Sequence, residues 1–574
     1  MLLICWVCGD PHSFPIEISP EKIVGELKKA IVAETPNRFR GIDADVLSLW
    51  KKIIPTSDRK RLQPSDLKED ELDETWRIDD YFEEAPQARR IHIIIKAPEP
   101  IGDDSLAFRG VKRKYDEEGQ AQALLKRFAD QAPSSLAKPT LFQIKASGLV
   151  NCNRPFDYDS LPITLLEEEF ANFKDDCARE PSVVAVQLLG DLTVAACEWY
   201  DREDVRRDAL AEVILNTTNV SISPGVIKGT QRMTDGNSKS VVIPALIREC
   251  KNNEGCALFE AIGYYSNFLR EKLNLQGYTR FPSIIMINVG KSEALSFVQQ
   301  LRNWPGPQIG FFGCIWTGKR ILVEPLTPIF DLTVHWTDDE ARLMIAAALD
   351  AVLKAIPRLD QHYLGIGLAQ NEIQREYPFA TSFVDNTGLR ANFVYTDRIN
   401  GKLLFNAVTE AGDDIVVKFT RRYSETVHHF LARQGHAPTL RAVTHIPGGW
   451  EMVVIDRSKY TQLGDFSLTL KLRDETRLAI KKGVGEIIER LHAEDLVHGD
   501  IRQTNILVDE NTLGNPEGVS LQLIDFDWAG RAGEVKYPLN INTKTIRRPV
   551  DATGGTKITK SHDLQMIELL FYSI

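Results

Sequence analysis

SVVIPALIRECK, residues 240–251, is a β-rich stretch that ends in an acidic residue, a cysteine and a lysine. A turn that is expected to expose Asp235 precedes it. Because side chains alternate between the two faces of a strand, Glu249 and Lys251 should share one face, while Cys250 points to the core. The sequence therefore predicts a hairpin that gathers Asp235, Glu249 and Lys251 at one place.

These three side chains have the chemistry of a metal-dependent nuclease. Asp235 and Glu249 would bind Mg²⁺ or Mn²⁺, and Lys251 would polarise the attacking water and stabilise charge on the phosphate. An acidic residue two positions before a lysine is common by chance. The aspartate 14 positions upstream of Glu249, the apolar strand and the helical run at 256–273 make the combination more specific. It is typical of a restriction-endonuclease-like (PD-(D/E)xK) domain with three catalytic residues, and the expected substrate is DNA.

The sequence around the hairpin predicts the rest of such a domain. Further strands are expected at 283–289 (SIIMINV) and 310–316 (GFFGCIW), which indicates a mixed sheet flanked by helices. We assign this domain to residues 141–360. Residues 98–140 are more polar and are predicted to form a linker that carries one helix.

Residues 1–97 have the pattern of a small β-grasp domain. Strands are expected at 1–8 and 13–18 around a turn at Gly9–Pro11, a helix at 21–34, and further strands at 47–54 and 90–96. This order fits a ubiquitin-like fold, which usually serves binding rather than catalysis. Cys5 and Cys8 form a lone CxxC pair, but strand alternation would turn them to opposite faces, which argues against a zinc or redox site.

Three motifs in this segment resemble the N-terminal domain of Crinkler effectors: GELKKAI at 25–31, LWKKIIP at 49–55 and HIIIKAP at 92–98. The last is similar to the family's HVLVxxP border, with conservative apolar exchanges. The LFLAK-type translocation motif of water-mould members is absent, which puts an inherited delivery mechanism in doubt. The resemblance implies secretion and action in a host cell, in its nucleus, with host proteins bound through this ubiquitin-like domain. A generic ubiquitin-like adaptor is the alternative.

The resemblance extends to a helix at 199–215 (WYDREDVRRDALAEVIL). Restriction-endonuclease-like domains often add a glutamate from a preceding helix. Glu203 lies in an aromatic-aromatic-x-x-Glu pattern that is similar to that of Crinkler nuclease domains, which implies that Glu203 is a third metal ligand. In the alternative, Glu203 pairs with an arginine three or four positions later at helical spacing. Glu260, in the helical run at 256–273, is a weaker candidate for a metal ligand.

Residues 361–574 contain three motifs of a protein kinase in the kinase order. HGDIRQTN has the spacing of the catalytic loop, in which Asp500 would orient a substrate hydroxyl and Asn505 would hold Mg²⁺. Further along, LIDFD supplies a metal-binding Asp525. Upstream, IVVK ends in Lys418, which would pair with the phosphates of ATP. The segment is therefore predicted to have a protein-kinase-like fold.

Several departures argue against a working kinase. No glycine-rich loop precedes Lys418, and the helix that should offer it a glutamate has His428 or His429 instead. Asp527 stands at the position of the DFG glycine, and the chain ends soon after SHDL at 561–564, which resembles the anchoring aspartate of the next helix. We therefore expect a truncated kinase-like fold with a regulatory role.

The composition is that of an ordinary globular protein. Of 574 residues, 43% are hydrophobic and 26% charged, which suits three or four domains. The formal net charge of -11 excludes a surface that coats nucleic acid as a whole, so contacts with DNA must be local. Eight irregularly spaced cysteines indicate reduced thiols. No apolar run approaches the roughly 20 residues of a membrane span, and the N-terminus lacks the basic region of a signal peptide.

These observations predict a multidomain α+β and α/β protein that acts as a secreted, metal-dependent DNA endonuclease. Its cofactor would be Mg²⁺ or Mn²⁺, with ATP as a second candidate for the kinase-like domain. Two alternatives stay open: an active kinase with a non-cleaving nucleic-acid-binding domain, and a non-enzymatic scaffold. The expected partners are DNA and host proteins, without a membrane. Because nucleases of this fold often dimerise, a homodimer is the starting assumption.

Overall fold

The computed structural model describes most of the chain: residues 1–7, 13–34, 47–55, 72, 76–82, 90–96, 110–152, 161–200, 202–227, 230–239, 242–251, 255–273, 280–290, 307–364, 374–399, 402–465, 468, 472–515 and 518–571. Its internal contacts divide the chain into two compact units, Met1–Lys114 and Tyr115–Ile574. The finer boundaries near residues 97, 140 and 360 remain predictions.

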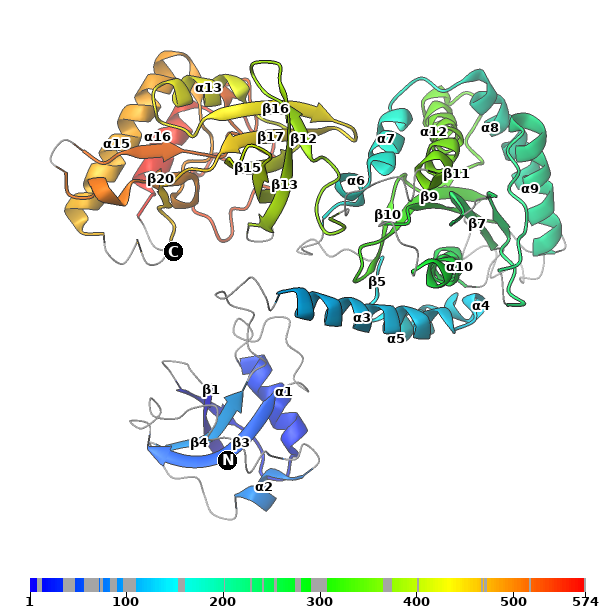
Figure 1. The fold of residues 1–574 in the computed structure, drawn as a ribbon, viewed down its shortest axis with the longest axis horizontal. Coiled ribbons are helices and arrows are strands. Elements are labelled where there is room, and N and C mark those ends of the chain that lie inside the picture. The colour runs from blue at the N-terminus through cyan, green and yellow to red at the C-terminus, as the bar shows by residue number, and fades with distance from the viewer. Residues whose placement is uncertain are drawn as a thin grey trace. The chain divides into compact units, whose positions relative to one another are not determined.

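The first unit is a four-stranded sheet with a helix packed on it, in the strand order β2-β1-β4-β3 (Figure 1). Its elements are β1 Leu2–Val7, β2 Ser13–Glu17, α1 Val24–Glu34, β3 Ser48–Pro55, α2 Ile78–Tyr81 and β4 Arg90–Lys96. Strands β1 and β4 run parallel and the other pairs are antiparallel. The apolar face of α1 closes the core over β1 and β4, as the sequence pattern indicated.

Two details of the first unit differ from the prediction. Helix α1 begins at Val24 and not at Glu21, because the backbone at 22–24 bonds to the segment around Arg77: Val24 N donates to Trp76 O, and Ile78 N donates to Lys22 O. The short helix α2 was not predicted. The turn at Gly9–Pro11, Cys8 and the last two residues of HIIIKAP lie outside the described residues.

The second unit begins with a seven-stranded mixed sheet in the order β5-β10-β9-β8-β7-β6, with β11 paired to β9. Its strands are β5 Val150–Asn151, β6 Gly236–Asn237, β7 Leu246–Lys251, β8 Ser283–Val289, β9 Gln308–Trp316, β10 Ile321–Pro325 and β11 Phe330–Asp331. The pairs β7/β8 and β5/β10 are parallel and the others antiparallel. The predicted mixed sheet is confirmed, and β8 has its predicted bounds, but β7 begins at Leu246, after Pro244, and not at Ser240.

Helices cover both faces of this sheet (Figure 1). On one face lie α3 Gly110–Ala129, α4 Pro133–Leu136, α5 Pro139–Ala146 and α10 Ala257–Lys272; on the other lie α6 Ile163–Leu166, α7 Glu168–Cys177, α8 Val183–Cys197, α9 Glu203–Thr218 and α12 Asp339–Leu364. The alternation of β9 divides the two cores: Phe311 and Ile315 face α7, α8 and α12, whereas Phe312 and Trp316 face α3 and α10. Helix α3, predicted within the linker, therefore packs into the core of this unit.

The rest of the second unit has two lobes. The first is a six-stranded antiparallel sheet with one helix: β12 Ser382–Val384, β13 Arg390–Arg398, β14 Leu404–Thr409, β15 Asp414–Thr420, α13 Glu425–Arg433, β16 Leu440–Ile446 and β17 Trp450–Asp456. The second contains β18 Thr461–Gln462, α15 Asp474–Ala493, β19 Leu496–Val497, the 3-10 turns Gln503–Asn505 and Glu510–Thr512, β20 Ile506–Val508, β21 Leu521–Leu523, β22 Gly530–Arg531 and α16 Lys560–Glu568. The motifs HGDIRQTN and LIDFD flank the β20–β21 hairpin.

The six-stranded sheet shares one hydrophobic core with α7 and α12 of the preceding segment. Trp450 Nε1 donates to Thr164 Oγ1 at 3.2 Å, and the Arg421 guanidinium stacks on the Trp450 ring at 3.6 Å. Gly448 N also donates to Asp175 Oδ1 at 3.0 Å. The two segments are thus packed as one body. In the described part of the chain, no helix has both the length and the apolar character needed to cross a membrane.

Candidate functional sites

The predicted hairpin is formed by β6 and β7, and Asp235 directly precedes β6. The strands pair antiparallel, with Gly236 opposite Arg248. Asp235 Oδ2 accepts a hydrogen bond of 3.0 Å from Cys250 N, and the Thr234 hydroxyl accepts one from Asn237 Nδ2 at 3.0 Å. The aspartate is therefore fixed against the strand that carries the other two residues of the triad.

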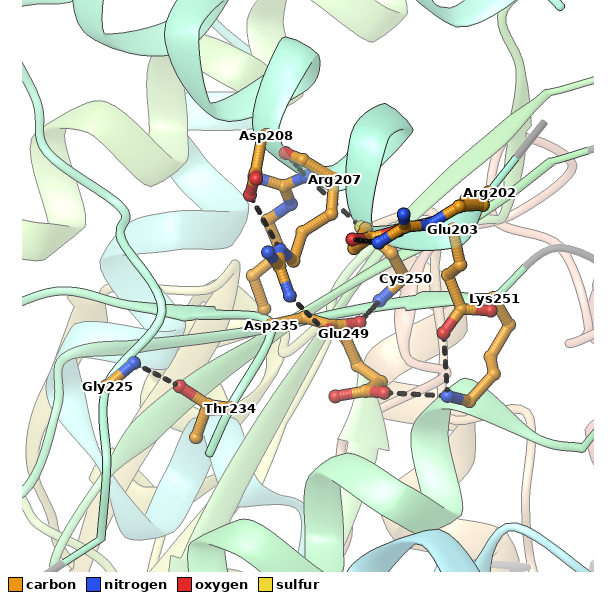
Figure 2. Close-up of polar contacts among 12 residues, drawn as sticks. Arg202, Glu203, Arg207, Asp208, Gly225, Thr234, Asp235, Glu249, Cys250 and Lys251 are labelled. Carbon is orange, nitrogen blue, oxygen red and sulfur yellow. Dashed lines mark hydrogen bonds and ion pairs between the residues drawn. The ribbon is translucent and has the colours of Figure 1, made fainter. Parts of the chain in front are cut away.

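The Lys251 ammonium lies among three glutamates (Figure 2 shows two of them). Its Nζ is 3.0 Å from Glu249 Oε1, 3.0 Å from Glu260 Oε2 and 3.3 Å from Glu203 Oε1. The contact with Glu249 follows from the alternation of β7. Glu203 and Glu260 come from α9 and α10, on opposite faces of the sheet. The structure thus brings together every residue predicted for this site, including the weaker candidate Glu260.

The site combines burial with several carboxylates close to one another. The Glu249 side chain is 2% exposed, and its Oε2 has no hydrogen-bond partner among the described residues. Burial raises the pKa of the Glu249 carboxyl well above its usual range, and the carboxylates of Asp235 and Glu260 raise it further. Burial lowers the pKa of Lys251, but its glutamate neighbours raise it more, so the lysine stays protonated. The Lys251 ammonium is therefore shared by the three glutamates.

In the described part of the structure, no three His, Cys, Asp or Glu side chains stand close enough together to enclose a metal ion. Lys251 Nζ occupies the position toward which the glutamates point. The orphaned Glu249 oxygen and the all-carboxylate set nevertheless have the ligand chemistry that Mg²⁺ prefers. The roles of Glu203, Asp235 and Glu249 as metal ligands remain predictions.

Two arginines lie beside this cluster: Arg207, which the sequence analysis considered only with Arg206 as a partner of Glu203, and Arg248, which it did not single out. Arg207 Nη1 lies 3.7 Å from Asp235 Oδ1 and Arg207 Nε lies 2.7 Å from Asp208 Oδ1. Arg248 is fully buried and donates to Asn288 Oδ1, to Arg207 O and to Cys250 Sγ. Arg248 directly precedes Glu249 on β7, so strand alternation places the two side chains on opposite faces of the sheet. The sequence could have predicted this position of Arg248.

The predicted catalytic loop of the kinase-like segment is anchored by Asp563. Its two carboxylate oxygens accept the backbone N–H groups of His498 and Gly499 at 2.9 and 2.8 Å. Asp563 is fully buried in α16. The SHDL motif therefore supplies the anchoring aspartate that the sequence indicated.

Asp500 is surrounded by donors. Its Oδ2 accepts hydrogen bonds from Asn505 Nδ2 at 2.8 Å and from Arg502 Nε at 2.9 Å, and its Oδ1 accepts one from Arg548 Nη1 at 2.9 Å. The Arg548 guanidinium also lies over the Trp528 ring, 4.7 Å from its centroid. The sequence analysis did not identify Arg502 or Arg548 as partners of Asp500. Only Arg502 could have been proposed from the sequence, because it lies two positions after Asp500.

Lys418, on β15, meets the LIDFD loop. Its Nζ lies 2.5 Å from Asp525 Oδ1 and 2.6 Å from Asp527 Oδ1. Burial works against the charge of Asp525, but the Lys418 ammonium holds the pKa of Asp525 below its usual value. Lys418 thus lies beside the predicted metal-binding aspartate, and the two residues expected at the phosphates and the metal ion come together.

The described geometry defines a two-lobed, kinase-like C-terminal part that follows the mixed α/β segment in the chain. Comparison with known proteins agrees, since residues 458–548 match the lipopolysaccharide kinase (Kdo/WaaP) family. Two solved structures have a weak likeness to the chain, the kinase PK-1 of the Cydia pomonella granulovirus and the Rad53 kinase domain and SCD2 in complex with AMPPNP. The first has 14% identity, a TM-score of 0.26 and coverage of 31% of this chain and 66% of that one. The second has 18% identity, a TM-score of 0.19 and coverage of 24% and 51%.

The N-terminal unit resembles the N-terminal domain of known effector proteins. Residues 1–96 match the Crinkler effector protein N-terminal domain. Crinkler effector protein 1 of Rhizophagus irregularis is 34% identical over 128 residues, which is 22% of this chain and 26% of that protein. The chain thus spans about a quarter of the length of this curated relative. The match lies in the N-terminal part of the chain, and it confirms the resemblance to Crinkler effectors seen in the three N-terminal motifs.

Proposed function

We propose that the seven-stranded domain is a restriction-endonuclease-like, metal-dependent nuclease that cleaves DNA. The observation that carries this proposal is the position of the Lys251 ammonium, within 3.3 Å of Glu203, Glu249 and Glu260. The Asp235 carboxylate is bonded to the same strand. Charged side chains from β7, α9 and α10 thus converge on one largely shielded ammonium, which marks a candidate functional site.

In this mechanism Glu203, Asp235 and Glu249 would hold Mg²⁺ or Mn²⁺, which would supply polarisation of a phosphoryl oxygen and of an attacking water. Lys251 keeps its proton among the glutamates and stabilises negative charge that develops on the phosphate. The buried Glu249 oxygen without a hydrogen-bond partner supports a cation at this point.

The test is cleavage of plasmid DNA by the full-length chain, with Mg²⁺ or Mn²⁺ and with EDTA. Glu249→Gln and Lys251→Met should lower the rate at least ~100-fold, as expected for loss of a catalytic group. Glu212→Gln, on the same helix as Glu203 and outside the site, should cleave like the unaltered protein. Cleavage that survives both substitutions, or that needs no metal, would contradict the proposal. Single-stranded RNA in a parallel assay tests the choice of DNA.

We propose further that the kinase-like domain binds Mg²⁺ and ATP and regulates the nuclease. Lys418, Asn505 and Asp525 would contact the nucleotide and its ion. Regulation is preferred to phosphotransfer because Arg548 and Arg502 already occupy Asp500, the candidate base. An active kinase is the second candidate, supported by the loop that Asp563 anchors. ATP-dependent change in DNA cleavage supports the first, and autophosphorylation that Asp500→Ala abolishes supports the second.

The family suggests where these activities would operate. We infer that the protein is secreted as an effector, enters a host cell and acts in its nucleus, with host proteins bound through the ubiquitin-like N-terminal domain. A fluorescent fusion in host cells tests the location, and its exclusion from nuclei would contradict it. Sedimentation of the purified chain, with and without DNA, tests the expected homodimer.

A further inference from the structure

Lys418 has two carboxylate partners, and both belong to the LIDFD loop. Nζ lies 2.5 Å from Asp525 and 2.6 Å from Asp527. The side chains of Lys418, Asp525 and Asp527 are 16%, 28% and 25% exposed, so the pairs are largely shielded from water. A shielded ammonium requires well-placed partners, because its desolvation is otherwise uncompensated.

Protein kinases fix this lysine with a glutamate from the helix that follows its strand. Here that helix, α13, places His428 in the core with 1% exposure. The ring nitrogens of His428 are used elsewhere: Nδ1 lies 2.7 Å from Tyr423 Oη and Nε2 lies 2.8 Å from Pro438 O. Glu425, in the first turn of α13, is exposed. The helix therefore presents an imidazole that is committed to other contacts.

Asp527 is held in place by the end of β15. The Thr420 hydroxyl donates to Asp527 Oδ2 at 3.1 Å, and Arg422 Nε donates to Asp527 O at 2.9 Å. Asp525 adopts a left-handed backbone with φ of 73°, whereas Asp527 does not lie in that region. A side chain is thus accommodated at the position where kinases have the DFG glycine.

We propose that Asp527 replaces the missing helix glutamate and is the positioning residue that holds Lys418 toward the phosphates of a bound nucleotide. The proposal rests on nucleotide binding by the kinase-like domain, as proposed above. Since both partners of Lys418 lie on one loop, its position does not depend on a movement of α13. The loop that would hold the metal ion through Asp525 also aligns the lysine.

A double-mutant cycle on the full-length chain tests this role, with Mg²⁺-AMP-PNP as the probe and calorimetry as the readout. Asp527→Asn should weaken binding about tenfold, the effect of one charge-assisted hydrogen bond. Asp527→Gly, which recreates the DFG sequence, should weaken it similarly. In a Lys418→Met background, Asp527→Asn should have no further effect. If the full loss persists in that background, Asp527 binds the metal or nucleotide by itself and the inference is wrong.

A second readout needs no nucleotide. Acetylation of amines by acetic anhydride, followed by mass spectrometry, measures the reactivity of Lys418, with the 79% exposed Lys482 as internal reference. Asp527→Asn should raise the rate at Lys418 several-fold and leave Lys482 unchanged, while Glu425→Gln should change neither. Equal Lys418 rates with and without Asp527 would overturn the inference. If the unaltered chain binds no AMP-PNP, the proposed nucleotide binding fails, and the labelling still decides the partner of Lys418.

Discussion

Asp235 accepts a hydrogen bond of 3.0 Å from the backbone N–H of Cys250, 15 residues further along the chain. This bond ties the turn before β6 to the middle of the Glu249-Cys250-Lys251 triplet. The carboxylate thus has two separable properties: it accepts a structural hydrogen bond, and it carries a negative charge beside Glu249. The two can be separated by substitution.

Asp235→Asn should keep the hydrogen bond to Cys250 and lose the charge. We expect DNA cleavage to fall at least ~100-fold, as for other catalytic groups, with an unfolding temperature close to that of the unaltered chain. Asp235→Ala loses the acceptor as well and should be less stable by about 1 kcal/mol. Cleavage rates and thermal unfolding of both variants check this. If the Asp235→Asn variant is active, Asp235 is not a metal ligand.

Lys251→Met should leave Glu249 and Glu260 buried without their cation. Removing one partner of a buried ion pair costs about 3–5 kcal/mol, so we expect a loss of stability of that order in chemical unfolding. Adding Glu260→Gln to Lys251→Met should recover part of the loss, because it removes one of the uncompensated charges. An unchanged stability of Lys251→Met would show that the lysine does not hold the glutamates together.

Asp563→Ala should leave the buried N–H groups of His498 and Gly499 without acceptors. Each lost acceptor costs about 1–3 kcal/mol, so the kinase-like domain should lose stability and bind Mg²⁺-AMP-PNP more weakly. Asp563→Asn retains one acceptor and should be milder. Glu568→Gln, 77% exposed on the same helix, is the control that should match the unaltered chain. Thermal unfolding and calorimetry check the series, and equal behaviour of Asp563→Ala and the control would contradict it.

His428 should make α13 sensitive to acid. Burial lowers the pKa of His428 to about 4, whereas an unfolded histidine titrates near ~6.5. Below about pH 6.5, His428 binds a proton in the unfolded state but not in the folded state. The free energy of unfolding therefore decreases as pH falls from about 6.5 to about 4. Between pH 7 and 5 the loss is on the order of 2 kcal/mol. Hydrogen exchange of α13 peptides, corrected for intrinsic rates, should show a smaller loss in His428→Gln; an equal loss would assign it to other groups.

Local patterns predicted much of the fold. Strand β4 and strand β8 lie where the apolar runs indicated, and α10 differs from its predicted range by one residue at each end. The residues of the kinase-like motifs also lie together as predicted: Asn505 contacts Asp500, and Lys418 contacts Asp525. Predictions were less accurate at helix starts: α9 begins at Glu203 and not at Trp199. Helix ends depend on bonds to distant segments, which a local pattern does not contain.

The sequence by itself determined several central strands, the resemblance of the N-terminal domain and the order of the kinase-like motifs, because periodicity and motif spacing are local properties of the chain. Only the tertiary structure decided which charges meet. Glu203 and Glu260, 57 positions apart, both reach Lys251 because their helices cover opposite faces of one sheet. Asp527 reaches Lys418, and Arg548 reaches Asp500, because folding closes loops over more than 100 and more than 40 residues. Contacts between residues so far apart in the sequence depend on tertiary packing, which no local stretch of sequence specifies.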